Sequence, residues 1–358
     1  MKASGKERWG RVALQLAGLI AFGLVVANAD LGLAAKLLKD AGPILLVGFI
    51  PYIFQIGLDS LSWRTILGAL RYKVRWRRLL AIRLSTEAVL MSVPAGGIVG
   101  ETLKPYLLYK SDRVPGAAAV ASIGAKKTFL VFAQATYLLL AVVIGWGLLG
   151  RISHGVIGAP GLPIFVACAV VFLLVVGCVM SFALVEGAVS ARIHGLLMKA
   201  PIRRFQAWLG ERRAPFDDTD SSFRAIGRAS RLRLFAAYGC LVLAWFVETF
   251  ETWLLLHLIG VEISAVHAFT MEAVLVFVRN MAFFLPAGLG VQDAGYLAFL
   301  HAYGVAHASA SGGAFVILKR SKEAFWVAVG FLTLFFLQRR VAREGGPEVA
   351  PVSTTETA

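Results

Sequence analysis

Long apolar blocks constrain the fold of this sequence more than any other feature. Six of these blocks contain few charged residues and are about as long as a membrane span: residues 12–29, 43–62, 128–149, 162–185, 234–257 and 323–338. A helix needs about 20 apolar residues to cross about 30 Å of hydrocarbon. Inside lipid only helices and closed barrels satisfy their backbone groups. The blocks are too long and too uniformly apolar for barrel strands, so the sequence predicts an all-α, polytopic membrane helical bundle.

The charged residues lie mostly between these blocks. The net charge of +15 would suggest nucleic acid binding in a soluble protein, but only 16% of residues are charged and 58% are hydrophobic. The N-terminus, residues 64–83, residues 186–233 and the segment after residue 338 are basic, whereas 30–42 and 150–161 are nearly neutral. Basic loops stay in the cytoplasm and attract anionic lipid headgroups. We therefore expect lipid contacts at these loops, no nucleic acid partner, and cytoplasmic N- and C-termini in a bacterial inner membrane.

Two further stretches, about 79–109 and 267–303, are apolar but interrupted by proline, glycine and charges. If every basic loop is cytoplasmic, the first stretch must begin and end on the cytoplasmic side. The second must begin and end on the outer side. This charge count predicts that both stretches are re-entrant hairpins and not complete spans.

The two broken stretches also resemble one another. Five positions match at a constant shift: Pro94, Ala95, Gly96, Val99 and Glu101 with Pro286, Ala287, Gly288, Val291 and Asp293. A shift one residue larger pairs 126–128 with 319–321. We expect an internal repeat, about 43–149 and about 235–341, whose copies run in opposite directions through the membrane. Inverted repeats with broken helices are common in secondary transporters. The alternative is chance, because short matches of alanine, glycine and proline arise easily in such a composition.

Charged side chains inside these stretches are the candidate site. Charge in a membrane costs about 2.5–3.5 kcal/mol on insertion scales and marks functional positions. The expected cavity residues are Arg83, Glu87, Glu101, Lys104, Lys126, Lys127, Glu272, Arg279, Asp293, Lys319 and Arg320. The residues expected to shape the hairpin turns are Pro94, Gly96, Gly97, Pro286, Gly288 and Gly290. Acids with a surplus of bases suit an anionic or zwitterionic headgroup. Internal ion pairing without a ligand is the alternative.

No motif for metal, cofactor or covalent catalysis is found. The three cysteines, Cys168, Cys178 and Cys240, lie in apolar runs without CxxC spacing, and we expect them to be small buried hydrophobes. The six histidines show no HExxH or other metal spacing. We expect no metal, no cofactor and no enzymatic activity.

The two hairpin motifs resemble a known family. Residues 93–101 read Val-Pro-Ala-Gly-Gly-Ile-Val-Gly-Glu, and 285–295 read Leu-Pro-Ala-Gly-Leu-Gly-Val-Gln-Asp-Ala-Gly. They resemble the integral-membrane domain of bacterial lysylphosphatidylglycerol synthases and the related stand-alone flippase-like proteins, some of them hopanoid-associated. The resemblance covers roughly residues 10–340. The sequence departs from the family pattern at Asp293, where glutamate is usual, at Ala95, and at Lys126-Lys127, where a Glu-Arg type pair is usual.

The resemblance implies lipid transfer between leaflets. We expect a flippase-like transporter of a phospholipid or hopanoid-type lipid, without the aminoacyl-transferase domain of the two-domain synthases. Glu87, Glu101 and Asp293 would act as protonatable gates or amine partners, and Arg279, Lys126, Lys127, Lys319 and Arg320 would hold phosphate. Two alternatives stay open: a non-catalytic partner of an envelope-lipid synthase, and a membrane-embedded lipid-modifying enzyme that uses Glu101 or Asp293 as a base.

The expected organisation is a single membrane domain over residues 1–341. Its loop 186–233 carries amphipathic surface helices, for example from Ile193 to Leu209. The tail, 342–358, is rich in proline, threonine and glutamate, and we expect it to be disordered. A homo-oligomer is left open.

Overall fold

The computed structural model describes residues 31–92, 96–186, 190, 195, 198, 213–281 and 288–343. All elements in these ranges are helices, and the prediction of an all-α chain is confirmed for them. In chain order they are α2 (Leu31–Ala41), the 3-10 helix η1 (Gly42–Phe49), α3 (Pro51–Ala69), α4 (Trp76–Ser92), α5 (Gly96–Asp112), α6 (Gly116–Ile157), α7 (Leu162–Glu186), α10 (Arg213–Gly227), α11 (Arg231–Leu258), α12 (Ala265–Met281), α13 (Val291–Ala302) and α14 (Ala308–Arg343).

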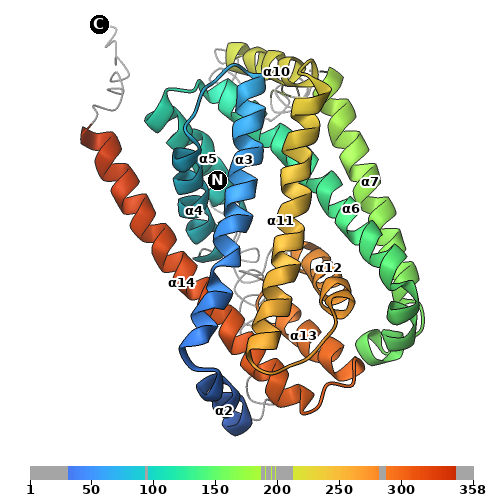
Figure 1. The fold of residues 1–358 in the computed structure, drawn as a ribbon. Helices are drawn as coiled ribbons and strands as arrows, with labels where there is room; N and C mark the ends of the chain where they lie inside the picture. Colours follow the sequence, from blue (N-terminus) through green and yellow to red (C-terminus); the bar gives the residue numbers. More distant parts are fainter. Residues whose placement is uncertain are drawn as a thin grey trace, which may run out of the picture.

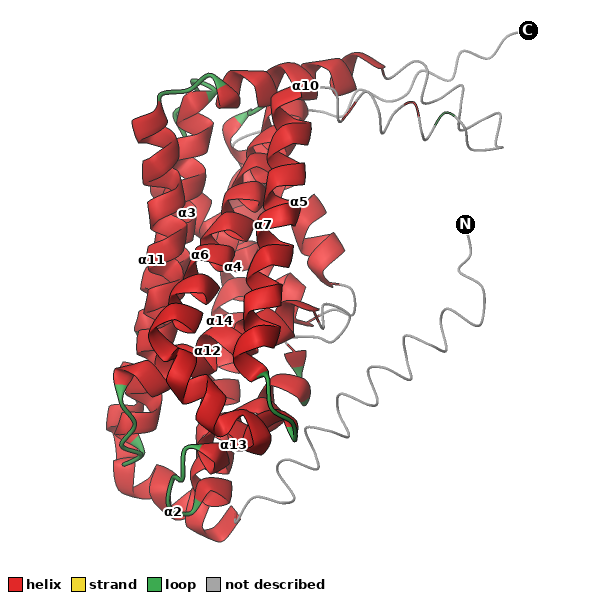
Figure 2. Cartoon of the chain, turned by 90° about the vertical axis from the view of Figure 1, so that its right-hand side faces the viewer, coloured by secondary structure: helices red, strands yellow, loops and turns green. Residues whose placement is uncertain are grey.

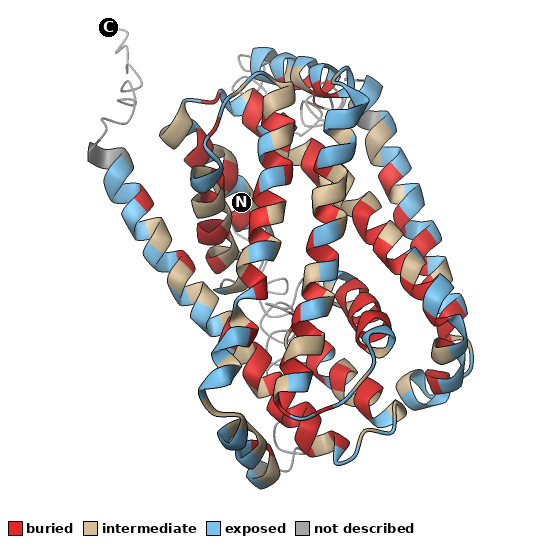
Figure 3. Ribbon diagram, in the orientation of Figure 1, coloured by how far each residue is buried: buried red, intermediate tan, exposed pale blue. Residues whose placement is uncertain are grey.

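Four helical stretches in the described part are long and apolar enough to cross a membrane: Gly32–Ala69, Gly116–Ile157, Leu162–Phe182 and Arg231–Leu258. They contain or largely overlap four of the six predicted spans. The predicted span 12–29 lies outside the described residues, and 323–338 lies within α14, which is not among the four. Large apolar side chains such as Phe54, Phe172 and Phe335 are exposed, as lipid-facing residues are. Buried and exposed positions alternate along the long helices (Figure 3).

Two segments predicted as neutral loops are helical. Residues 31–41 form α2, and α6 extends to Ile157, so most of 150–161 belongs to that helix. Helix α6 ends at Ile157, and the next residue, Gly158, has a φ of +70° and adopts the left-handed conformation typical of a helix terminus. Low charge alone does not distinguish a loop from a helix end, and this is why the prediction was wrong.

Helix α10 lies across one end of the bundle (Figures 1 and 2). Its Phe223 and Ile226 are buried against Ile66, Ala121 and Ala125, while its other face is exposed. An amphipathic helix in the 186–233 loop is therefore present, although the structure describes only residues 195 and 198 of the example predicted over 193–209.

The long helices α3 and α11 lie side by side along the centre of the molecule (Figure 1). Helices α4 and α5 pack together beside one half of them, and α12 and α13 pack together beside the other half. We call these pairs the first and the second hairpin. Helix α14 packs against α4, and α6 packs against α12. The long helix that follows each hairpin therefore also contacts the opposite hairpin.

The glycines of the two hairpins have different positions. Gly288 and Gly290, shortly before α13, have φ values of +64° and +82°, a backbone conformation that favours glycine. Gly96 and Gly97 instead lie in the first turn of α5. Pro94 and Pro286 lie outside the described residues.

Candidate functional site

The first group of interior charges surrounds Asp59, which lies on α3. Its carboxylate accepts hydrogen bonds from Arg83 Nε on α4, at 3.0 Å, and from Lys126 Nζ on α6, at 2.5 Å. Arg83 also pairs with Glu87 one helical turn further along α4, as their i,i+4 spacing predicts. Lys126 additionally lies over the ring of Trp63. The network therefore links three helices through two acids and two bases.

A second network of the same half surrounds Glu101, near the start of α5. Its Oε1 contacts Lys104 Nζ at 2.8 Å and Lys127 Nζ at 2.7 Å, so one carboxylate oxygen holds two bases. Lys104 is buried, but the Lys127 side chain is 41% exposed. Together with the Asp59 network, these residues form the first cluster: Asp59, Arg83, Glu87, Glu101, Lys104, Lys126 and Lys127.

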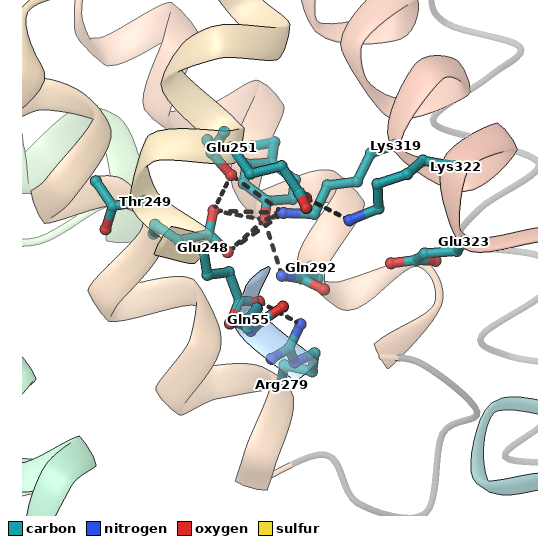
Figure 4. Close-up of polar contacts among 12 residues, drawn as sticks. Gln55, Glu248, Thr249, Glu251, Arg279, Gln292, Lys319, Lys322 and Glu323 are labelled. Carbon is teal, nitrogen blue, oxygen red and sulfur yellow. Dashed lines mark hydrogen bonds and ion pairs between the residues drawn. The ribbon is translucent and has the colours of Figure 1, made fainter. Parts of the chain in front are cut away.

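The other half of the molecule contains a second cluster: Glu248, Glu251, Glu272, Arg279, Asp293, Lys319, Arg320, Lys322 and Glu323 (most of it in Figure 4). Glu248 on α11 pairs with Arg279 Nη1 at 3.0 Å and accepts a hydrogen bond from Gln55 Nε2 at 2.8 Å. A Cβ at Gly288 would lie 2.8 Å from Arg279 Cγ, so glycine leaves room for that side chain.

Glu272 on α12 is completely buried and fully paired. It contacts Lys319 Nζ at 3.2 Å and accepts hydrogen bonds from Tyr296 Oη at 2.8 Å and Thr252 Oγ1 at 2.7 Å. Tyr296 in turn accepts hydrogen bonds from Lys319 Nζ at 2.6 Å and from Gln292 Nε2 at 2.8 Å. A continuous chain of polar groups thus crosses from α11 through α12 and α13 to α14.

The remaining members of the second cluster pair across α11, α13 and α14. Glu251 pairs with Lys322. Arg320 holds two acids, Asp293 at 2.8 Å and Glu323 at 2.6 Å. The second oxygen of Asp293 accepts the backbone N–H of Gly290 at 2.9 Å, so this side chain also fixes the start of α13.

Two of these pairs occupy matching positions of the expected repeat. Glu101 on α5 pairs with Lys127 on α6, and Asp293 on α13 pairs with Arg320 on α14. Asp293 stands 192 residues after Glu101, and Arg320 stands 193 residues after Lys127. Both pairs join the second helix of a hairpin to the long helix that follows it. The motifs aligned by sequence therefore make the same contact in the structure.

All eleven predicted cavity residues lie in the two clusters, six in the first and five in the second. The prediction missed Asp59, Glu248 and Glu251, because they lie in blocks that were interpreted only as spans. It also missed the polar partners Gln55, Thr252, Gln292 and Tyr296. The missed acids change the charge balance: the clusters together contain eight acids and eight bases, so the expected surplus of bases is wrong for the interior as a whole.

The described residues contain no group of three or more histidine, cysteine, aspartate or glutamate side chains arranged to hold a metal. Cys168 and Cys178 are exposed on α7, contrary to the expected burial, and Cys240 is half-buried. Apolar surroundings in a membrane include lipid, so an apolar run does not by itself place a cysteine inside the bundle.

Comparison with known proteins places these observations in one family. The model of the lysylphosphatidylglycerol synthase TM region matches residues 10–330. A UPF0104 membrane protein of Methanothermobacter thermautotrophicus is 23% identical over 318 residues, which cover 87% of this chain and 90% of the relative. No solved structure matches the chain.

Proposed function

The chain belongs to the lysylphosphatidylglycerol synthase TM-region family, and we propose that it moves a phospholipid or hopanoid-type lipid between the leaflets of the bacterial inner membrane. The matched ion pairs Glu101–Lys127 and Asp293–Arg320 carry this proposal. Charge is expensive inside a membrane and is retained where polar groups must pass or bind. Here it is concentrated beside the starts of α5 and α13.

The packing of the helices supports an inverted-repeat arrangement. Repeat one would comprise α3 to α6 and repeat two α11 to α14, with α3 and α11 side by side. Each hairpin contacts the long helix of the other repeat, α4 against α14 and α12 against α6. The distribution of basic loops puts the two repeats in opposite orientations. Both hairpins would then enter the membrane and return, and backbone at that depth is tolerated where it is buried in protein or lines a wet cavity.

In this proposal a lipid headgroup passes the hairpins while its acyl chains remain in the bilayer. Lys127 is the accessible base of the first cluster and would bind the phosphate. The buried bases Lys126 and Lys319 are already held by Asp59 and Glu272, so they would organise the helices and not bind the lipid directly. The phosphate would pair first with a base of one cluster and then with a base of the other. This pairing would lower the free-energy cost of moving the headgroup across the membrane.

The proposal is tested by leaflet exchange of a fluorescent phospholipid in liposomes that contain the purified protein. Wild type should accelerate exchange over protein-free liposomes. Lys127→Gln should slow it roughly tenfold or more, because a hydrogen bond to a charged group contributes about 1.5–3 kcal/mol. Glu101 keeps Lys104 as a partner in this variant, so the fold should persist.

Lys73→Gln is the matched control, because it removes an exposed base from the segment between α3 and α4. It should exchange lipid at the wild-type rate. Absence of exchange by wild type, with a phospholipid and with a hopanoid-type lipid, would overturn the proposal and favour the alternative of a lipid-synthase partner.

A further inference from the structure

The two clusters have opposite charge imbalances. The first contains three acids and four bases: Asp59, Glu87 and Glu101 with Arg83, Lys104, Lys126 and Lys127. The second contains five acids and four bases: Glu248, Glu251, Glu272, Asp293 and Glu323 with Arg279, Lys319, Arg320 and Lys322. An unbalanced charge away from water is costly. The first cluster therefore favours one additional negative charge, and the second favours one additional positive charge.

The excess positive charge of the first cluster is accessible from outside the protein. It arises where Glu101 is shared by Lys104 and Lys127, and Lys127 is the exposed member. The other oxygen of Glu101 is buried and has no hydrogen-bond partner. The exposed Lys127 is therefore the group that suits the phosphate of an anionic headgroup.

The excess negative charge of the second cluster is buried inside the protein. Glu251 Oε2 of this cluster is buried and has no hydrogen-bond donor, and the same holds for Oε1 of Gln292, which is hydrogen-bonded to Tyr296. Both side chains are only 1% exposed. Buried acceptors are costly unless they receive a donor. This part of the molecule therefore requires a positively charged hydrogen-bond donor that can reach atoms with almost no accessible surface.

A proton meets these requirements better than a lipid amine, because an ammonium headgroup needs space that the enclosed atoms do not offer. Building on the proposed lipid transport, we propose that Glu251 Oε2 binds a proton and that this proton is the ion coupled to lipid movement. Proton binding converts the carboxylate into a carboxylic acid, and proton release restores it. One proton neutralises the excess acid of the second cluster, and one anionic headgroup neutralises the excess base of the first. The two clusters together then carry no net charge.

The surroundings of Glu251 allow it to exchange a proton. Lys322 of α14 pairs with it and also lies over the ring of Tyr52 of α3, and Glu248 precedes it by three residues on its own helix. Lys319, three residues before Lys322 on α14, contacts Glu272 of α12 and donates a hydrogen bond to Tyr296 of α13. The ion pair with Lys322 favours the ionised carboxylate, and burial favours the protonated one. Buried acids of this kind serve as proton relays in membrane transporters.

The protonation is tested by infrared difference spectroscopy of the purified protein between alkaline and acidic pH. Wild type should show the carbonyl band of a protonated carboxylic acid, and Glu251→Gln should lose it. Asp59→Asn is the matched control: Asp59 occupies the repeat position of Glu251 but is held by two bases, so its replacement should leave the band unchanged. A band that persists in Glu251→Gln overturns the proposal.

The coupling is tested with an anionic fluorescent phosphatidylglycerol in liposomes with a pH gradient. If one proton accompanies each lipid, a gradient of one pH unit should enrich the lipid about tenfold in the leaflet facing the higher pH, since one unit is about 1.36 kcal/mol. Glu251→Gln should abolish the enrichment, and Glu251→Asp, which keeps a carboxyl group, should retain it. Glu262→Gln removes an exposed acid outside the cluster and should behave as wild type.

Different results would overturn the lipid-transport proposal and the proton-coupling proposal. Wild-type exchange without gradient-driven enrichment overturns proton coupling and leaves lipid transport intact. No exchange together with a band that depends on Glu251 overturns lipid transport, and the proton site itself stands.

Discussion

Lys319 and Glu272 show what individual residues contribute to this molecule. Their side chains are 5% and 0% exposed, and each has further polar partners in Tyr296 and Thr252. Removing both charges of a buried pair is often nearly neutral, whereas removing one charge leaves the other uncompensated. Such pairs therefore fix which helices lie together, even where they add little net stability.

Lys319→Met should therefore lower the free energy of unfolding by about 3–5 kcal/mol, because Glu272 would keep its charge without a base. Adding Glu272→Gln to that variant should recover much of the loss. Thermal unfolding of the detergent-purified proteins measures both effects. A double variant that is less stable than Lys319→Met alone would contradict this reading of the pair.

At this scale the sequence predicted the residues near the hairpin motifs and missed those within the spans. Repeated motifs with charges pointed to Glu101 and Asp293, and both lie in matching ion pairs. Glu248 and Glu251 are three residues apart, so they lie near one face of a helix, and their presence in an apolar block was a usable signal. Which base meets which acid depends on helix packing, and a single sequence does not contain that information.

Close helix crossings determine how the two halves fit together. A Cβ at Gly330 on α14 would lie 2.6 Å from the Leu84 carbonyl oxygen and 2.6 Å from Ala88 Cβ on α4. A Cβ at Gly145 on α6 would lie 2.2 Å from Thr270 Cγ2 on α12. The added Cβ at position 330 would meet the backbone carbonyl of Leu84, which cannot rotate away. The added Cβ at position 145 would meet a single side-chain methyl group. The α4–α14 crossing should therefore be the less tolerant.

Gly330→Ala should destabilise the protein by about 1–3 kcal/mol, as overpacking of a tight contact does. Gly145→Ala should cost less, because the Thr270 side chain can change its rotamer. Gly147→Ala has open space around the added methyl group and should be neutral or slightly stabilising. Unfolding midpoints of the three variants provide the comparison. Equal losses for Gly330→Ala and Gly145→Ala would show that the backbone contact does not limit the crossing.

The helices were predicted well where a long apolar block identifies them and poorly where no such block is present. The blocks 128–149, 162–185 and 234–257 lie in the long helices α6, α7 and α11, whereas 43–62 is divided between η1 and α3. The limits of α2 and α6 were missed, because helix continuation depends on neighbours that pack against weakly polar residues. The crossing glycines also carry no distinctive pattern, since 36 glycines occur in the chain.

For the whole molecule, the distribution of basic residues predicts opposite orientations of the two repeats. In a variant with the native cysteines replaced by serine, Glu262→Cys should react with an impermeant thiol reagent from outside the cell. Asp218→Cys, on exposed α10, should react only after the membrane is opened. Labelling of Glu262→Cys only from the cytoplasmic side would contradict the inverted arrangement.

The central claim is that the two hairpins line one lipid pathway. Lipid exchange by Glu101→Gln, Asp293→Asn and the double variant tests it most directly, because these substitutions remove matched charges and preserve side-chain shape. If both residues serve one pathway, their effects are coupled, and the double variant should exchange lipid no more slowly than the slower single variant. Losses that multiply in the double variant, or single variants that exchange lipid at the wild-type rate, would contradict the account.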